Sequence, residues 1–215
     1  NLLKMHRVQF ITHSTPRYDY LAGVELALKG GCRWIQLRMK DASAEQILSA
    51  SRDVKTRCEH YGAKFIIDDH VELVIPAGAD GVHLGKNDMP VTEARQILGK
   101  DKIIGATANT LEDVLRGFHS GADYIGCGPY RFTRTKENLS PIIGLEGYLE
   151  IMRQAREQGV SIPIVAIGGV GLPDIEPLMG VGVDGVALSG SVLRADDPIQ
   201  EMQAIVEMVK RYDKR

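Results

Sequence analysis

The chain has few cysteines, no long apolar run and almost no excess of charge, and each shortage excludes a class of protein. Its three cysteines, at positions 32, 58 and 127, are an odd and widely spaced set, which argues against a disulfide framework. No apolar run approaches the ~20 residues that a membrane-spanning helix needs. The 26 basic and 28 acidic residues nearly cancel, so charge gives no basis for binding nucleic acid or a membrane.

Secretory and zinc-binding patterns are missing too. The N-terminal residues lack the apolar segment before a small-residue cleavage site that marks a signal peptide. Neither His-x-x-x-His nor Cys-x-x-Cys occurs, so we do not expect a zinc site. With few cysteines as well, the sequence predicts a cytoplasmic protein.

Short apolar runs alternate with amphipathic stretches of helix length along almost all of the chain. Eight runs are predicted as strands, at residues 8–12, 34–37, 64–67, 81–84, 102–106, 124–127, 163–167 and 185–188. Eight strands alternating with helices in 215 residues predict a parallel (β/α)8 TIM barrel that forms one domain over residues 1–215. A doubly wound open sheet is the alternative.

One short pattern recurs before three of the predicted strands. Gly-Ala-Asp-Gly-Val at 78–82 returns as Gly-Ala-Asp-Tyr-Ile at 121–125 and Gly-Val-Asp-Gly-Val at 182–186. The recurrence favours a closed barrel. Each aspartate precedes its strand, at the end of a barrel that serves stability and not catalysis, so we predict structural roles for Asp80, Asp123 and Asp184.

The segment 33–41 carries two kinds of side chain on opposite faces. Period-2 alternation directs Ile35, Leu37 and Met39 to one face and Gln36, Arg38 and Lys40 to the other. Two cations and an amide are costly to bury without a negative partner. We therefore predict an anion-binding face, the alternative being a solvated edge strand.

Carboxylates follow two neighbouring predicted strands. Asp68 and Asp69 come after residues 64–67, and Asp88 comes shortly after residues 81–84. Carboxylates together with substrate phosphates are the usual ligands of Mg²⁺, so Asp69 and Asp88 are candidate metal ligands. Each could instead cap the helix that follows it.

Two further loops have the composition of phosphate sites. After residues 124–127, a loop with glycine and proline leads to Thr133, Thr135 and Lys136, which offer two hydroxyls and a cation. Gly168-Gly169 and Ser189-Gly190-Ser191 follow the last two predicted strands, where barrels often bind phosphate.

These motifs, in this order, resemble those of the thiamine phosphate synthase family. The resemblance runs from about residue 8 to residue 193 and rests on Gln-Leu-Arg-Met-Lys at 36–40, Ile-Asp-Asp at 67–69, Gly-Val-His-Leu-Gly-Lys-Asn-Asp at 81–88, Gly-Cys-Gly-Pro at 126–129, Thr-Arg-Thr-Lys at 133–136 and Ala-Ile-Gly-Gly-Val at 166–170. It implies an Mg²⁺-dependent transferase that joins hydroxymethylpyrimidine diphosphate to thiazole phosphate and releases pyrophosphate.

The resemblance also implies roles for individual residues. Arg38, Lys40 and Lys136 would act in catalysis by holding the departing diphosphate, with Gln36 beside them. Asp69 and Asp88 would bind Mg²⁺. The remaining substrate contacts would come from Asp68, Thr107, Thr133, Thr135, Gly169, Ser189 and Gly190.

Three of these positions depart from the family pattern. Asp68 stands where the family usually has Asn, which places an extra carboxylate near a diphosphate. Thr107 replaces a frequent Ser and adds a methyl group. Gly190 stands where a Ser is expected, so a side-chain donor to phosphate is lost or displaced.

Two other functions remain open on the same barrel. A thiazole tautomerase would need a base for proton transfer, and Cys127-Gly128-Pro129 stands where that enzyme has a loop histidine. A noncatalytic sensor of phosphorylated ligands would bind without turnover. The expected partners are small phosphorylated molecules, and a homodimer is an open prediction.

Overall fold

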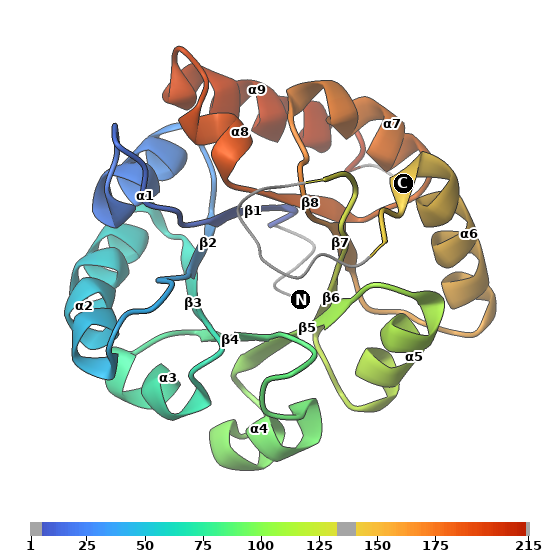
Figure 1. The fold of residues 1–215 in the computed structure, drawn as a ribbon, viewed down its shortest axis with the longest axis horizontal. Helices are drawn as coiled ribbons and strands as arrows, with labels where there is room; N and C mark the ends of the chain where they lie inside the picture. Colours follow the sequence, from blue (N-terminus) through green and yellow to red (C-terminus); the bar gives the residue numbers. More distant parts are fainter. Residues whose placement is uncertain (1–5, 133–140, 214–215) are drawn as a thin grey trace.

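The computed structural model describes residues 6–132 and 141–213, and its centre is a closed barrel (Figure 1). Eight strands are hydrogen-bonded in chain order, each parallel to the next, and β8 pairs with β1 to close the ring. The strands are β1 Val8–Ile11, β2 Trp34–Leu37, β3 Lys64–Asp68, β4 Gly81–Leu84, β5 Ile103–Ala108, β6 Tyr124–Cys127, β7 Ile164–Ala166 and β8 Gly185–Leu188. The predicted TIM barrel is confirmed, and the open sheet is wrong.

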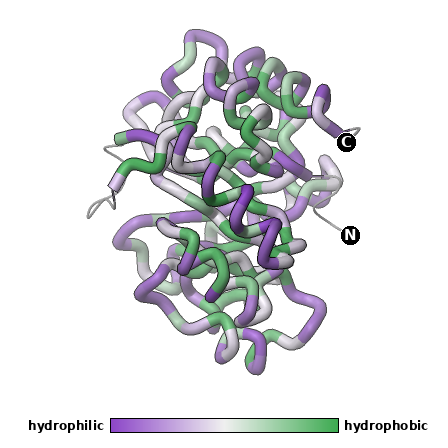
Figure 2. Tube along the Cα trace, turned by 90° about the vertical axis from the view of Figure 1, so that its right-hand side faces the viewer, coloured by the Kyte–Doolittle hydropathy of each residue, from purple (hydrophilic) through white to green (hydrophobic). Residues whose placement is uncertain are grey.

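Helices form a ring around the barrel (Figure 1). They are α1 Tyr20–Lys29, α2 Ala44–Tyr61, α3 Val71–Ala77, α4 Val91–Leu98, α5 Leu111–His119, α6 Gly144–Glu157, α7 Ile175–Gly180, α8 Gly190–Leu193 and α9 Pro198–Lys210, with a 3₁₀ turn at Leu172–Asp174. Along these outer helices, green and purple segments alternate in Figure 2, as expected when one face packs inward and the other meets water. No helix among residues 6–132 and 141–213 is long and apolar enough to cross a membrane.

β2, β4, β6 and β8 have the predicted bounds, and the other four strands differ from the prediction by one or two residues at an end. The largest difference is β5, which runs to Ala108 and not to residue 106. Thr107 and Ala108 are held in the sheet because they pair with Gly126 and Cys127 of β6. Pairing with a neighbouring strand, which local sequence does not reveal, therefore carries Thr107 into the barrel wall.

The apolar residues divide into two layers. The larger layer lies between strands and helices and includes Ile35 and Leu37 of β2. A smaller cluster, which includes Trp34 and Tyr124, forms a separate group with residues from other strands. The alternation predicted for β2 is thus confirmed, since Gln36 lies on the opposite face from Ile35 and Leu37 and is also buried. Each fully buried large side chain contributes ~1.5–3 kcal/mol to folding.

The three recurring aspartates have the predicted structural role. Each accepts a hydrogen bond of 2.8 Å, through its side chain, from the backbone N–H of the preceding strand in the barrel. The pairs are Asp80 with Phe65, Asp123 with Ile104, and Asp184 with Ile164. The repeat fastens alternate strands at the amino-terminal end of the barrel, away from the loops that follow the strands.

Candidate active site

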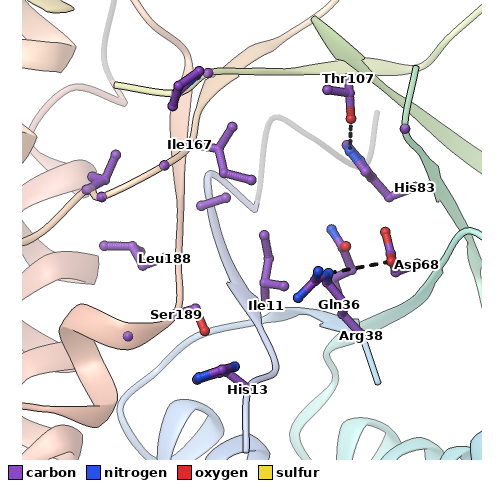
Figure 3. A pocket seen from close by; sticks show the side chains of 18 of the residues that line it. Ile11, His13, Gln36, Arg38, Asp68, His83, Thr107, Ile167, Leu188 and Ser189 are labelled. Atoms are coloured by element: carbon purple, nitrogen blue, oxygen red, sulfur yellow. Dashed lines mark hydrogen bonds and ion pairs between the residues drawn. The ribbon is translucent and has the colours of Figure 1, made fainter. Parts of the chain in front are cut away.

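A cavity of about 580 Å³ opens where the carboxyl ends of the strands meet their loops (Figure 3). Residues in or after each of the eight strands line it. It contains most of the predicted substrate residues, namely Gln36, Arg38, Asp68, Thr107, Gly169, Ser189 and Gly190, together with the candidate metal ligand Asp88. Residues that are separated by more than 150 positions in the sequence therefore line one cavity.

Some predicted residues are not part of this lining. Lys40 is exposed in the turn after β2, and Asp69 is not among the lining residues. Thr133, Thr135 and Lys136 lie outside the described residues. Their roles remain predictions.

The Arg38 guanidinium faces the carboxylate that departs from the family pattern. Nε of Arg38 lies 3.8 Å from Oδ2 of Asp68, and both side chains are partly exposed (Figure 3). The resemblance places this extra carboxylate near a diphosphate, which it should repel unless it is protonated or metal-bound. In the structure a cation lies beside it, which reduces that repulsion.

A chain of buried hydrogen bonds crosses the barrel interior beneath the cavity. Nε2 of Gln36 donates to Oε1 of Gln9 (2.7 Å), and Nε2 of Gln9 donates to the Tyr124 hydroxyl (3.3 Å). His83 contacts that hydroxyl through Nδ1 (2.7 Å) and Thr107 Oγ1 through Nε2 (2.9 Å). All four bonds are satisfied if Tyr124 donates to Nδ1 and Nε2–H donates to Thr107. The Thr107 proton is then available to a ligand in the cavity.

These hydrogen bonds indicate that His83 has a structural role and does not act as a proton-transfer catalyst. Both of its ring nitrogens have partners, and its side chain is buried. Burial also raises the pKa of Tyr124, which keeps the phenol protonated as a donor. The two residues thus connect two predicted substrate contacts, Gln36 and Thr107.

Asp69 and Asp88 form a pair of neighbouring carboxylates. Burial, and then the negative charge of Asp88, raise the pKa of Asp69. Asp69 has a left-handed backbone with φ of 68°, a conformation that Asp tolerates better than most residues. Oδ2 of Asp88 accepts a hydrogen bond from Gly85 N–H at 2.6 Å.

The helix-cap explanation for these two aspartates is wrong. His70 precedes α3 and Pro90 precedes α4, and neither helix begins with a side-chain cap bond. Within the described ranges, no group of three or more His, Cys, Asp or Glu residues is placed to hold a metal. Two converging carboxylates nevertheless fit Mg²⁺, which takes one or two protein carboxylates and completes its shell with water and phosphate oxygens.

The opposite side of the cavity is built from the loops after β7 and β8. Gly168 and Gly169 have φ values of 96° and 71°, which a side chain would strain. Ser191 Oγ donates to Val170 O at 2.8 Å and joins the two loops. Ser189 Oγ is buried and has no hydrogen-bond partner in the part of the chain that the structure describes.

A third loop is fastened to these two. Arg131, which follows β6, makes two hydrogen bonds to the buried Asp174 carboxylate, at 2.9 and 2.7 Å. It also donates to Gly169 O at 3.2 Å. This paired contact fixes the approach of the β6 loop to the glycine turn.

The lining residues that the sequence analysis missed include His13 and Arg194. Burial, and then the charges of Arg38 and Arg194, lower the pKa of His13, so its imidazole favours the neutral form. The rule that directs attention to strand ends would have found His13 after β1. Arg194 lies one turn beyond β8 and had no such signal.

Cys127, at the end of β6, has the properties of a packing residue. It is buried, and burial raises the pKa of its thiol to about 12. A thiol with so little thiolate is a poor nucleophile.

The barrel as a whole is similar to proteins of one family. The family model described as thiamine monophosphate synthase matches residues 8–192. Thiamine-phosphate synthase of Phocaeicola vulgatus is 55% identical over 95% of this chain and 99% of its own length, and that of Flavobacterium johnsoniae is 45% identical over 89% and 91%. The solved thiamine phosphate pyrophosphorylase of Pyrococcus furiosus is 32% identical, covers 99% of both chains and superposes with a TM-score of 0.86.

These similarities extend over all eight strands and the loops that line the cavity. They agree with the motifs read from the sequence and with the closed barrel. The chain belongs to the thiamine monophosphate synthase family.

Proposed function

We propose that this barrel joins hydroxymethylpyrimidine diphosphate to thiazole phosphate, giving thiamine phosphate and pyrophosphate with Mg²⁺ in the cytoplasm. Thiamine-phosphate synthase activity, a transferase activity of thiamine biosynthesis, follows from its relatives. The observation that supports the detailed reaction is the cavity itself. It places the Arg38 cation and the Asp88 carboxylate in one space with the Gly169 and Ser189 loops.

The proposed roles follow the charge on the two substrates. Gln36, Asp68 and Thr107 hold the pyrimidine, while Arg38, Lys40 and Lys136 hold its diphosphate. Asp69 and Asp88 would hold Mg²⁺, which when bound adds positive charge beside the departing pyrophosphate. The thiazole phosphate is held by Thr133, Thr135, Gly169, Ser189 and Gly190.

The proposed reaction depends on stabilisation of charge more than on proton transfer. The bond between the exocyclic methylene carbon and the diphosphate oxygen breaks, its electron pair leaves with pyrophosphate, and the thiazole nitrogen forms the new carbon–nitrogen bond. Negative charge grows on the leaving group, and in its proposed role Arg38 stabilises that charge. No general base is required, which agrees with a His83 whose ring nitrogens contact Tyr124 and Thr107.

The experiment is thiamine phosphate formation by the full chain from both substrates, with Mg²⁺ or with a chelator. We expect product only with Mg²⁺, and loss of at least ~100-fold in rate for Asp69→Ala. Asp101→Ala is the matched control, because Asp101 is exposed and precedes β5 at the other end of the barrel.

Other outcomes would identify the alternatives. Chelator-resistant synthesis would refute the metal assignment. Binding of thiazole phosphate without any product would favour the sensor, and conversion of a thiazole phosphate carboxylate without the pyrimidine would favour the tautomerase. The homodimer stays a prediction, which light scattering of the purified chain tests.

A further inference from the structure

Gly190 lacks a side chain for a reason other than backbone conformation. Its φ is outside the left-handed range that calls for glycine. A Cβ added there would lie 2.2 Å from Nη1 of Arg194 and 3.1 Å from its Cζ. The space that a side chain at position 190 would occupy is therefore filled by the Arg194 guanidinium.

Local helix geometry explains this position. The Arg194 N–H donates to Gly190 O at 2.9 Å, so the two residues are one helical turn apart. Long side chains on helices lean toward the preceding turn, which brings the guanidinium back over Gly190 and to the cavity that both residues line.

The Arg194 guanidinium has no negative partner in the protein as far as residues 6–132 and 141–213 show. No carboxylate lies within ion-pair distance of it there, and its side chain makes no hydrogen bond. The charged groups that influence nearby His13 are also cationic, Arg38 and Arg194 themselves. Arg194 therefore offers five N–H donors at the cavity, with no described carboxylate within ion-pair distance, and such a guanidinium matches the oxygens of a phosphate.

A second, independent feature lies beside it. Ser189 lines the same cavity, and its Oγ is buried without a hydrogen-bond partner among the described residues. Figure 3 shows Ser189 and His13 on the same side of the cavity. A buried hydroxyl without a hydrogen-bond partner destabilises the protein, and a ligand that bonds to the hydroxyl removes this cost.

We propose that Arg194 binds the phosphate of the thiazole substrate and replaces the side-chain donor that is missing at Gly190, with the Ser189 hydroxyl as a second contact. This inference rests on the proposed function and adds a binding residue to it. Arg194 and Gly190 then form a unit, in which the glycine makes room and the arginine supplies the bonds.

The test uses calorimetric binding of thiazole phosphate and of the unphosphorylated thiazole alcohol to the full chain. Arg194→Gln should weaken thiazole phosphate by about 10–100-fold, the usual effect of losing hydrogen bonds from a charged donor. Alcohol binding and the KM for the pyrimidine diphosphate should change by less than about twofold. Arg52→Gln, an exposed arginine on outer helix α2, is the control and should change neither.

Two further variants separate phosphate binding from a packing role. Arg194→Lys keeps the charge and should give an intermediate affinity. Adding Gly190→Ser to Arg194→Gln restores a hydroxyl in the vacated space, and we expect recovery of about threefold or more. Thermal unfolding of each variant confirms that it is folded.

The outcomes for the two proposals are distinct. Equal weakening of the phosphate and the alcohol, or no weakening of either, would overturn the role of Arg194. If the wild-type chain makes thiamine phosphate and Arg194→Gln binds thiazole phosphate normally, only this inference fails. If the wild-type chain makes no product but Arg194→Gln selectively loses thiazole phosphate, the proposed reaction fails and this inference stands.

Discussion

Replacing Tyr124 by Phe tests whether the buried hydrogen-bond chain holds the barrel interior together. The substitution keeps the ring and deletes a single oxygen. That oxygen lies 2.7 Å from His83 Nδ1 and 3.3 Å from Gln9 Nε2, and all three side chains are buried. In the variant, Gln9 Nε2 loses its acceptor and His83 Nδ1 loses its donor, and both groups remain buried.

The expected cost follows from those two contacts. A buried polar group that loses its partner costs about 1–3 kcal/mol, and the long bond to Gln9 contributes the smaller share. We expect the free energy of unfolding to fall by about 2 kcal/mol. For a chain of this length that lowers Tm by about 4–8 °C.

Urea denaturation followed by circular dichroism measures the effect, with thermal unfolding as a second readout. The slope of the free energy against urea should not change, since the surface exposed on unfolding is the same. Tyr130→Phe is the control, because Tyr130 is also buried but its hydroxyl makes no hydrogen bond in the described part of the chain. Equal urea midpoints for wild type and Tyr124→Phe would refute a structural role for these buried hydrogen bonds.

Three other substitutions test packing, titration and loop attachment. Gly105→Ala puts a Cβ 2.1 Å from the ring of Tyr124 and should lower the free energy of unfolding by about 3 kcal/mol or more. Its control, Gly180→Ala, has nothing within 4 Å of the added Cβ and should lower it by less than ~0.5 kcal/mol in the same urea assay. For Asp113, burial opposes ionisation, but a backbone N–H and a lysine hold its pKa below the usual value. Its contribution to stability is therefore present above the unfolded pKa of ~3.9 and lost as pH falls through the folded pKa, so Asp113→Asn should flatten the fall of Tm below about pH 4. Arg131→Gln should cost about 1–2 kcal/mol, because Asp174 stays buried without its cation while the arginine itself is half exposed, and Asp174→Asn in the same chain should restore part of it.

The sequence by itself determined the barrel and the order of the groups around it. Strand and helix periods depend on neighbours two, three and four residues away, so alternating runs reveal eight βα units. The face of β2 that carries Gln36 and the structural roles of Asp80, Asp123 and Asp184 followed from the same local spacing.

Only the tertiary structure decided which of those groups meet. His83 and Tyr124 are 41 positions apart, and Gln9 and Tyr124 are 115 apart, yet their side chains share one hydrogen-bonded chain. Closing the barrel brings distant residues together, and no local period encodes those pairings. The position of Arg194 is a second example, since it depends on a missing side chain at Gly190 and on the fold of the turn between them. A contact between two side chains is fixed by the direction of each and by the packing around both, and these exist only once the chain has folded.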